Sequence, residues 1–155
     1  MHRLPSRVLV AAVAVVFGLA GGLAWWTSSS GARPSGRNAY LAQARAICKE
    51  YSADLNQIPP IQDPTMLGDV IESTNAALPL LHEQAYRIHE LTPPATLKPR
   101  VDRFFVITDR SIHTLESVRN AALKMNSGEV GMQLIRFGRQ TDAAKRLGRR
   151  IGYGC

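Results

Sequence analysis

Apolar residues recur at steps of three and four along four successive segments between residue 38 and the end of the chain. This spacing places the apolar side chains on one face of an α-helix, and no alternating run is long enough for a half-buried strand. Helix-breaking residues interrupt the pattern at Pro59-Pro60, at Pro93-Pro94 and at Asn126-Ser127-Gly128. We therefore predict an all-α domain of four helices.

Each predicted helix is apolar on one face only, so none is stable alone and the four have to share a core. The connections, at residues 59–63, 92–96 and 126–128, are short, which favours antiparallel neighbours. The expected fold class is an antiparallel up-down-up-down four-helix bundle with heptad stripes typical of coiled coils. A longer two-hairpin assembly that completes its core by dimerising is the alternative.

Capping residues and prolines set the expected helix boundaries. Asn38, Asp63 and Ser127 are the expected N-caps of the first, second and fourth helices. Pro64 is expected at the first position of the second helix, where its missing N–H costs nothing. Pro79 lies inside the second helix, and we expect it to kink that helix.

The stripes also predict the core. In the fourth helix Gly131 and Gly138 lie seven residues apart on one side, which fits the close approach of another helix. The expected inner faces are Leu41, Ala44, Cys48, Tyr51, Leu55 and Ile58 in the first helix, Leu67, Val70, Ile71, Thr74, Leu78, Leu81, Ala85 and Ile88 in the second, Leu97, Val101, Phe104, Thr108, Ile112, Leu115, Val118, Ala122 and Met125 in the third, and Val130, Leu134, Phe137, Thr141, Ala144, Leu147 and Ile151 in the fourth.

A run of 19 uncharged residues, 8–26, precedes the helical part of the chain. As a helix it would span roughly 28 Å, close to the hydrocarbon core of about 30 Å. Arg3 and Arg7 precede the run, and Trp25 and Trp26 end it where indoles favour the membrane interface. We predict a cytoplasmic leader (1–7), a transmembrane signal anchor (8–26), a flexible tether (27–37) and an extracytoplasmic bundle (38–155), held at the cell membrane in a single pass.

A cleaved secretory signal peptide is the alternative to an anchor. The small-x-Ala triplets that end at Ala24 and Ala32 are of the type that signal peptidases cut. The run of 19 residues is longer than the usual apolar region of a signal peptide, which has about 7–15 residues. Both hypotheses place the bundle outside the cytoplasm, either membrane-bound or secreted.

Positive charge is concentrated in the fourth predicted helix. The chain has 19 Lys and Arg against 12 Asp and Glu, a formal net charge of +7. Outside the last twenty residues the domain is close to neutral, which argues against nucleic acid as the partner. Either the bases are a solvated face, or they form a face for an anionic lipid or an acidic envelope polymer. They are Arg136, Arg139, Lys145, Arg146, Arg149 and Arg150.

The sequence contains no motif that indicates catalysis. It has no Gly-x-Ser-x-Gly, Cys-x-x-Cys, His-Glu-x-x-His or phosphate-binding glycine loop. His82 and His89 would lie roughly 10 Å apart along one helix, too far to share a metal ion without ligands from another helix. His113 is expected to point away from the inner face of its helix. We expect no enzymatic activity, no cofactor and no bound metal; a small metal-binding or redox protein that uses His82 and His89 is the alternative.

The two cysteines, Cys48 and Cys155, are expected to form one intramolecular disulfide. An exported domain meets an oxidising environment, and in the predicted topology the fourth helix ends near the start of the first. A covalent dimer through Cys155 is the competing outcome.

Three short segments resemble a known group of proteins: Ala-Arg-Ala-Ile-Cys-Lys-Glu-Tyr (44–51), Leu-Thr-Pro-Pro-Ala (91–95) and Ala-Lys-Arg-Leu-Gly (144–148), followed by the terminal Cys155. With Arg outnumbering Lys by 15 to 4, the chain resembles small exported or membrane-anchored helical proteins of unknown function from high-GC actinobacteria. The resemblance implies a helical fold and a cysteine pair, and it carries no activity. We expect a non-enzymatic binding or structural module of the cell envelope, acting alone or with a protein partner there.

Overall fold

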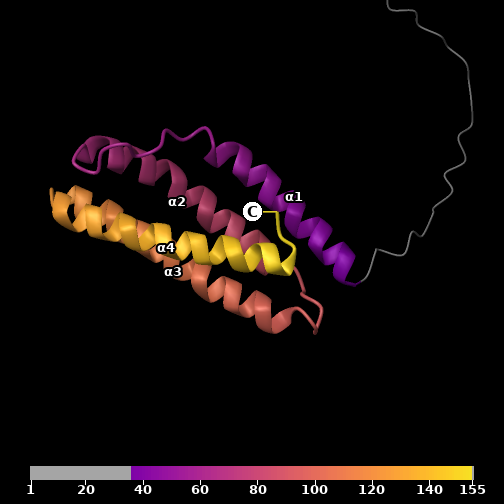
Figure 1. Ribbon diagram of the computed structural model, residues 1–155. Helices are drawn as coiled ribbons and strands as arrows, with labels where there is room; N and C mark the ends of the chain where they lie inside the picture. The colour runs from indigo at the N-terminus through magenta and orange to yellow at the C-terminus, as the bar shows by residue number, and fades with distance from the viewer. Residues whose placement is uncertain (1–35, 155) are drawn as a thin grey trace, which may run out of the picture. The chain divides into compact units, whose positions relative to one another are not determined.

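The computed structural model describes residues 36–154, which form four α-helices and no strand. The helices are α1 (Arg37–Leu55), α2 (Leu67–His89), α3 (Lys98–Leu123) and α4 (Ser127–Ile151). Helices that follow one another in the chain pack together and run in opposite directions (Figure 1). The predicted all-α helical bundle is therefore confirmed for this part of the chain.

The predicted leader, the anchor at 8–26 and the tether up to residue 35 lie outside the described residues. The first helix begins at Arg37, one residue before the expected boundary, and Gly36 precedes it with a φ of 107° in place of the expected Asn38 cap. Among the four described helices, none combines the length and the apolarity that a membrane crossing requires.

Two apolar clusters make up the core. The first joins α1 to the end of α2, the start of α3 and the end of α4, and the second joins the other parts of α2, α3 and α4. The first contains Leu41, Ala44, Cys48, Ile88, Val101, Phe104 and Ile151, and the second contains Val70, Leu78, Ile112, Leu115, Val118 and Val130. Residues 40–153 supply every member of both clusters, and they belong to one compact unit, residues 31–155. Both clusters therefore lie within this unit, which has its own hydrophobic core.

The connection between α1 and α2 is longer than predicted. The second helix begins at Leu67, whereas Asp63 and Pro64 lie in the preceding turn. The Asp63 carboxylate accepts hydrogen bonds from the backbone N–H and the hydroxyl of Thr65, at 2.8 and 2.7 Å. These bonds, the hydroxyl first, lower the pKa of Asp63. The expected cap at Asp63 was wrong because the carboxylate closes a local turn instead of a helix end.

The turn between α3 and α4 also differs from the prediction. Asn126, not Ser127, caps α4, because its side chain accepts a hydrogen bond from the Glu129 N–H at 3.1 Å. Met125, expected in the core, is 75% exposed and has a left-handed backbone with φ 58°. The N–H groups of Met125 and Asn126 bond the Ala122 and Ala121 carbonyls at 2.9 and 3.0 Å. This is the Schellman arrangement that ends many helices, here with methionine at the position that glycine favours.

One proline and two glycines inside the helices were expected to have special roles. Pro79 lies inside α2, as predicted, and is exposed there, while the expected kink stays a prediction. A Cβ added at Gly131 or Gly138 would meet no atom within 4 Å, so the expected close helix approach at these two positions was wrong. The close approach is at Gly148 instead, where an added Cβ would lie 3.4 Å from the Phe104 ring.

The chain turns back onto α1 after α4 ends (Figure 1). Gly152 has a φ of 106°, and its carbonyl accepts a hydrogen bond from Arg45 Nε at 2.7 Å. The Tyr153 side chain is buried, packs its ring against Phe104 with centroids 5.1 Å apart, and hydrogen-bonds the Tyr40 hydroxyl. Residues 152–154 therefore form a docked tail that fastens the end of α4 to the first turns of α1.

Candidate functional site

The six basic residues singled out in α4 are all exposed, and none forms an ion pair with a carboxylate of the described residues. Arg139, Arg146 and Arg150 are seven and four residues apart, so they share one side of the helix. Arg136 lies in a groove between α3 and α4, where it donates to Gln133 Oε1 at 3.3 Å. Lys145 lies on another side and lines a cavity. The six bases are thus all exposed along α4, and their role as one face for an anionic partner stays a prediction.

Two exposed apolar side chains extend the side of α4 that carries Arg139. Met132 and Ile135 are each 62% exposed, and they precede Arg139 by seven and four residues. The outer side of α4 is therefore apolar near its start and basic near its end. The spacing of residues 132, 135, 139, 146 and 150 could have indicated this side from the sequence, because it places them together on the side of the helix opposite its apolar stripe.

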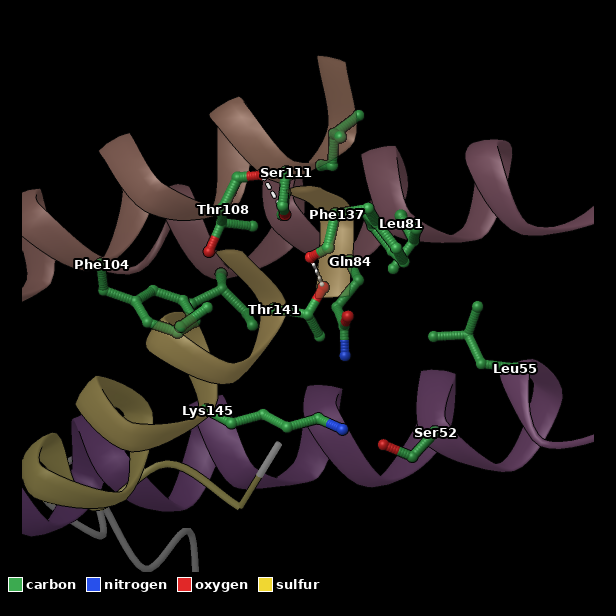
Figure 2. Close-up of a pocket in the computed structure, with 14 residues that line it drawn as sticks. Ser52, Leu55, Leu81, Gln84, Phe104, Thr108, Ser111, Phe137, Thr141 and Lys145 are labelled. Carbon is green, nitrogen blue, oxygen red and sulfur yellow. Dashed lines mark hydrogen bonds between the residues drawn. The ribbon is translucent and has the colours of Figure 1, made fainter. Parts of the chain in front are cut away.

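A cavity of about 220 Å³ lies between the two core clusters, and all four helices contribute to its wall. It lies at the last turn of α1, which supplies Ser52 and Leu55. The apolar side chains Leu81 of α2 and Phe137 of α4, which line the cavity, are only half-buried. Other apolar walls come from Ile88 and Ile112, and from Phe104, which is labelled in Figure 2.

Polar groups gather at one side of this cavity. Figure 2 shows the Lys145 ammonium pointing toward the Ser52 hydroxyl, with the Gln84 amide beside the same space. None of these three side chains hydrogen-bonds another described residue, and no Asp or Glu lines the cavity. The sequence could not indicate this group, because its members come from α1, α2 and α4.

Three hydroxyls line the inner part of the cavity. Ser111 Oγ donates to the Thr108 carbonyl at 2.7 Å, and Thr141 Oγ1 donates to the Phe137 carbonyl at 2.9 Å, so both are satisfied by their own helices. Thr108 Oγ1 is buried without a hydrogen-bond partner. An unpaired buried hydroxyl costs free energy unless a water or a ligand meets it.

The three described histidines lie on the surface of the bundle. His82 Nε2 and His113 Nδ1 contact the two oxygens of Glu116 at 3.1 and 2.9 Å. These contacts, that of His113 first, lower the pKa of Glu116. The His89 ring packs edge-on against Phe105, with centroids 4.8 Å apart. In the part of the chain that the structure describes, no three ligand-type side chains are arranged to hold a metal ion.

Cys48 is fully buried in the first core cluster, whereas Cys155 lies outside the described residues. The last described residue, Gly154, lies beside Arg45, since an added Cβ would be 3.6 Å from Arg45 Cγ. Arg45 precedes Cys48 by one turn of α1. The disulfide between Cys48 and Cys155 stays a prediction.

No family model, curated protein or solved structure matches this chain. The resemblance to small exported or membrane-anchored helical proteins of actinobacteria therefore stays a prediction.

Proposed function

We propose that this protein is a non-enzymatic module of the cell envelope that binds anionic lipid headgroups through the outer side of α4. The observation that carries the proposal is the sequence of exposed side chains along that side, where Met132 and Ile135 are followed by Arg139, Arg146 and Arg150. Binding to a membrane surface is strengthened both by burial of exposed apolar side chains and by attraction of bases to anionic lipids, and this side of α4 offers both. We call these five residues the α4 outer strip.

The chemistry of the strip favours lipid over an acidic polymer or a nucleic acid. Each base near an anionic membrane surface contributes about 1 kcal/mol at modest ionic strength. Guanidinium groups also bind phosphate with two parallel hydrogen bonds. A soluble polyanion would use the same charges, but it offers no apolar phase for Met132 and Ile135. A bilayer offers both.

A membrane anchor at residues 8–26 would keep the strip close to its target. We propose that the anchor holds the bundle on a tether of about ten residues, whose root-mean-square span is roughly 18 Å. The tether would raise the local concentration of lipid, so modest intrinsic affinity would be enough for stable contact. The disulfide between Cys48 and Cys155 belongs to the same proposal, because it would hold α4 onto α1 in an oxidising envelope.

Vesicle binding by residues 31–155 tests the proposal independently of the anchor. We expect binding to vesicles that contain an anionic phospholipid, weak binding to pure phosphatidylcholine, and a steep loss with added salt. Arg139→Gln, Arg146→Gln and Arg150→Gln together should weaken binding by roughly a hundredfold. A matched control with Lys49→Gln, Arg100→Gln and Arg103→Gln removes the same charge from exposed positions on α1 and α3 and should lose much less.

The apolar half of the strip separates lipid from polymer. Met132→Ser with Ile135→Ser should weaken vesicle binding and leave binding to a soluble polyanion such as dextran sulfate unchanged. If the protein binds the polyanion but not the vesicles, the partner is a polymer and the lipid proposal is wrong. Equal loss in the strip variant and in the control would show that only net charge matters.

A further inference from the structure

We infer that the cavity between the two core clusters binds a small amphipathic carboxylate, with its apolar body inside and its carboxylate at Lys145. This site is independent of the α4 outer strip, because Lys145 lies on a different side of α4 from Arg139, Arg146 and Arg150. The two proposals can therefore fail separately.

The volume of the cavity limits the size of the ligand. About 220 Å³ exceeds the roughly 150 Å³ of an engineered apolar cavity that holds benzene, and it is smaller than the roughly 300 Å³ at which drug-sized pockets begin. The occupant therefore has an apolar body larger than one benzene ring and smaller than a long acyl chain. Its walls are largely apolar, with Leu81, Phe104, Ile112 and Phe137 among them, so an apolar body gains affinity there by burial.

The position of the cavity makes it accessible. It lies where α1 ends, and Ser52 and Leu55 from its last turn form one edge. Gly131 and Gly138 precede Lys145 by fourteen and seven residues on nearly the same side of α4, and neither would have a neighbour within 4 Å of an added Cβ. No side chain at these two positions therefore blocks access to Lys145 along the surface of α4.

The polar side chains select an anion. Lys145, Gln84 and Ser52 supply ammonium, amide and hydroxyl donors from three helices, and they lie around one space in Figure 2. None makes a hydrogen bond with another described residue, and the lining contains no carboxylate that would neutralise Lys145. A carboxylate placed there would receive charge-assisted hydrogen bonds, which are stronger than those between neutral groups.

Thr108 adds an independent indication that the cavity accommodates a guest. Its hydroxyl oxygen is buried and lacks a hydrogen-bond partner, whereas the neighbouring Ser111 and Thr141 hydroxyls are satisfied. A water that accompanies the ligand, or a polar atom of the ligand itself, would remove this penalty.

Titration calorimetry of residues 31–155 with octanoate tests the inference. We expect saturable one-to-one binding of octanoate, about tenfold weaker binding of octanol, and no binding of octylammonium. In a series from butanoate upward, affinity should rise about fourfold for each added methylene and then stop rising once the cavity is full. Unlimited rise with chain length, or absence of saturable octanoate binding, would overturn the inference.

Variants then locate the ligand. Lys145→Gln should make octanoate bind no better than octanol, whereas the control Arg149→Gln, one turn further along α4 and outside the cavity lining, should keep the preference for octanoate. Ala144→Leu places extra volume in the lining and should abolish binding of both ligands; Ala85→Leu does the same from α2 if the first variant does not fold. If Lys145→Gln retains the preference, or if both folded leucine variants still bind, the assignment is wrong.

The two proposals predict opposite patterns in the same variants. The triple variant with Arg139→Gln, Arg146→Gln and Arg150→Gln should bind octanoate like wild type. The variants Ala144→Leu and Ala85→Leu should bind vesicles like wild type. A variant that loses both would indicate damage to the fold, which the thermal unfolding curve would reveal.

Discussion

The hydroxyls of Tyr40 and Tyr153 hydrogen-bond each other inside the bundle, across 113 residues of sequence. Tyr40 lies in the first turn of α1, and Tyr153 lies just after α4, so the bond joins the two ends of the described chain. Both side chains are buried, and burial is the main reason why the pKa of each hydroxyl is raised. The short tail after α4 is therefore part of the core.

Removing one hydroxyl of this pair should cost more than removing both. In Tyr153→Phe the Tyr40 hydroxyl stays buried without its partner, so the free energy of unfolding should fall by about 1–3 kcal/mol. In the double variant Tyr40→Phe and Tyr153→Phe no polar group is orphaned, and much of the loss should be recovered. Urea unfolding of residues 31–155 measures the free energy of unfolding of the single and the double variant.

The control is Tyr86→Phe, which removes an exposed hydroxyl bonded only to Glu90 and should have little effect on stability. If the double variant loses as much stability as the two single variants together, the expected coupling between the two hydroxyls is contradicted.

Gly152 should be intolerant of any side chain. Its φ of 106° is a conformation that L-residues rarely adopt, and an added Cβ would lie 3.2 Å from Leu41 Cδ1. We expect Gly152→Ala to lower the free energy of unfolding by about 1–3 kcal/mol, because strain and crowding act together. Gly154→Ala is the matched control, since its Cβ would meet Arg45 at an ordinary 3.6 Å. Thermal unfolding compares the two, and equal effects would mean that the tail is not docked as described.

Met125 offers the opposite case, a position where glycine should stabilise the protein. The methionine has a left-handed backbone at the end of α3, and its side chain is 75% exposed, so little packing is lost on its removal. Glycine adopts this conformation without steric cost, and we expect Met125→Gly to raise the free energy of unfolding by up to about 1 kcal/mol. Leu123→Gly, two residues earlier and still helical, should instead destabilise by about 1 kcal/mol. A loss of stability in Met125→Gly would contradict the assignment of strain to this turn.

Periodicity predicted the four helices because the apolar stripes are strong local signals, and most of the expected inner faces are buried or half-buried. The errors arose where short-range chemistry competes with the stripe. Asp63 bonds Thr65 instead of a helix end, and Met125 matches the apolar spacing although the backbone has already left the helix. Tyr153 was missed because a tail of three residues has no period.

The candidate site was less predictable than the fold. The spacing of residues within α4 predicts that the α4 outer strip lies on one side of the helix. The exposure of Met132 and Ile135, however, depends on which side of α4 the other helices cover. The cavity depends on where α1 ends relative to α2 and α4, which is a relationship between elements. Lys145 was predicted as one of the exposed basic residues of α4, and the sequence could not indicate that it also lines the cavity.

Glu116 should make the stability of the bundle sensitive to acid. Its carboxylate accepts from His113 of α3 and His82 of α2, and these contacts lower the pKa of Glu116. The folded state favours the carboxylate, so the stabilisation is complete above the ordinary glutamate pKa of about 4.3 and is lost as the pH falls through the lower folded-state value. Between about pH 5 and pH 3, wild type should lose more stability than Glu116→Gln. Glu83→Gln, whose carboxylate has no hydrogen-bond partner among the described residues, is the control and should follow wild type.

A disulfide between Cys48 and Cys155 would act on the same end of the bundle as the Tyr40–Tyr153 pair. Cys48 is buried in the first core cluster, and the described tail reaches Arg45, one turn before it. Closing a loop of about 100 residues is worth about 4–5 kcal/mol in the chain-entropy model, so Cys155→Ser should lower the free energy of unfolding by several kcal/mol. Because the tail is also docked by Tyr153 and Gly152, the variant should still fold, and its lower stability should appear as a lower midpoint of unfolding.

The bond itself is tested on unreduced wild-type protein. Thiol titration after denaturation should find no reactive thiol, and non-reducing electrophoresis should show a monomer. Two reactive thiols would refute the bond, and a reducible dimer would show that Cys155 pairs between chains instead.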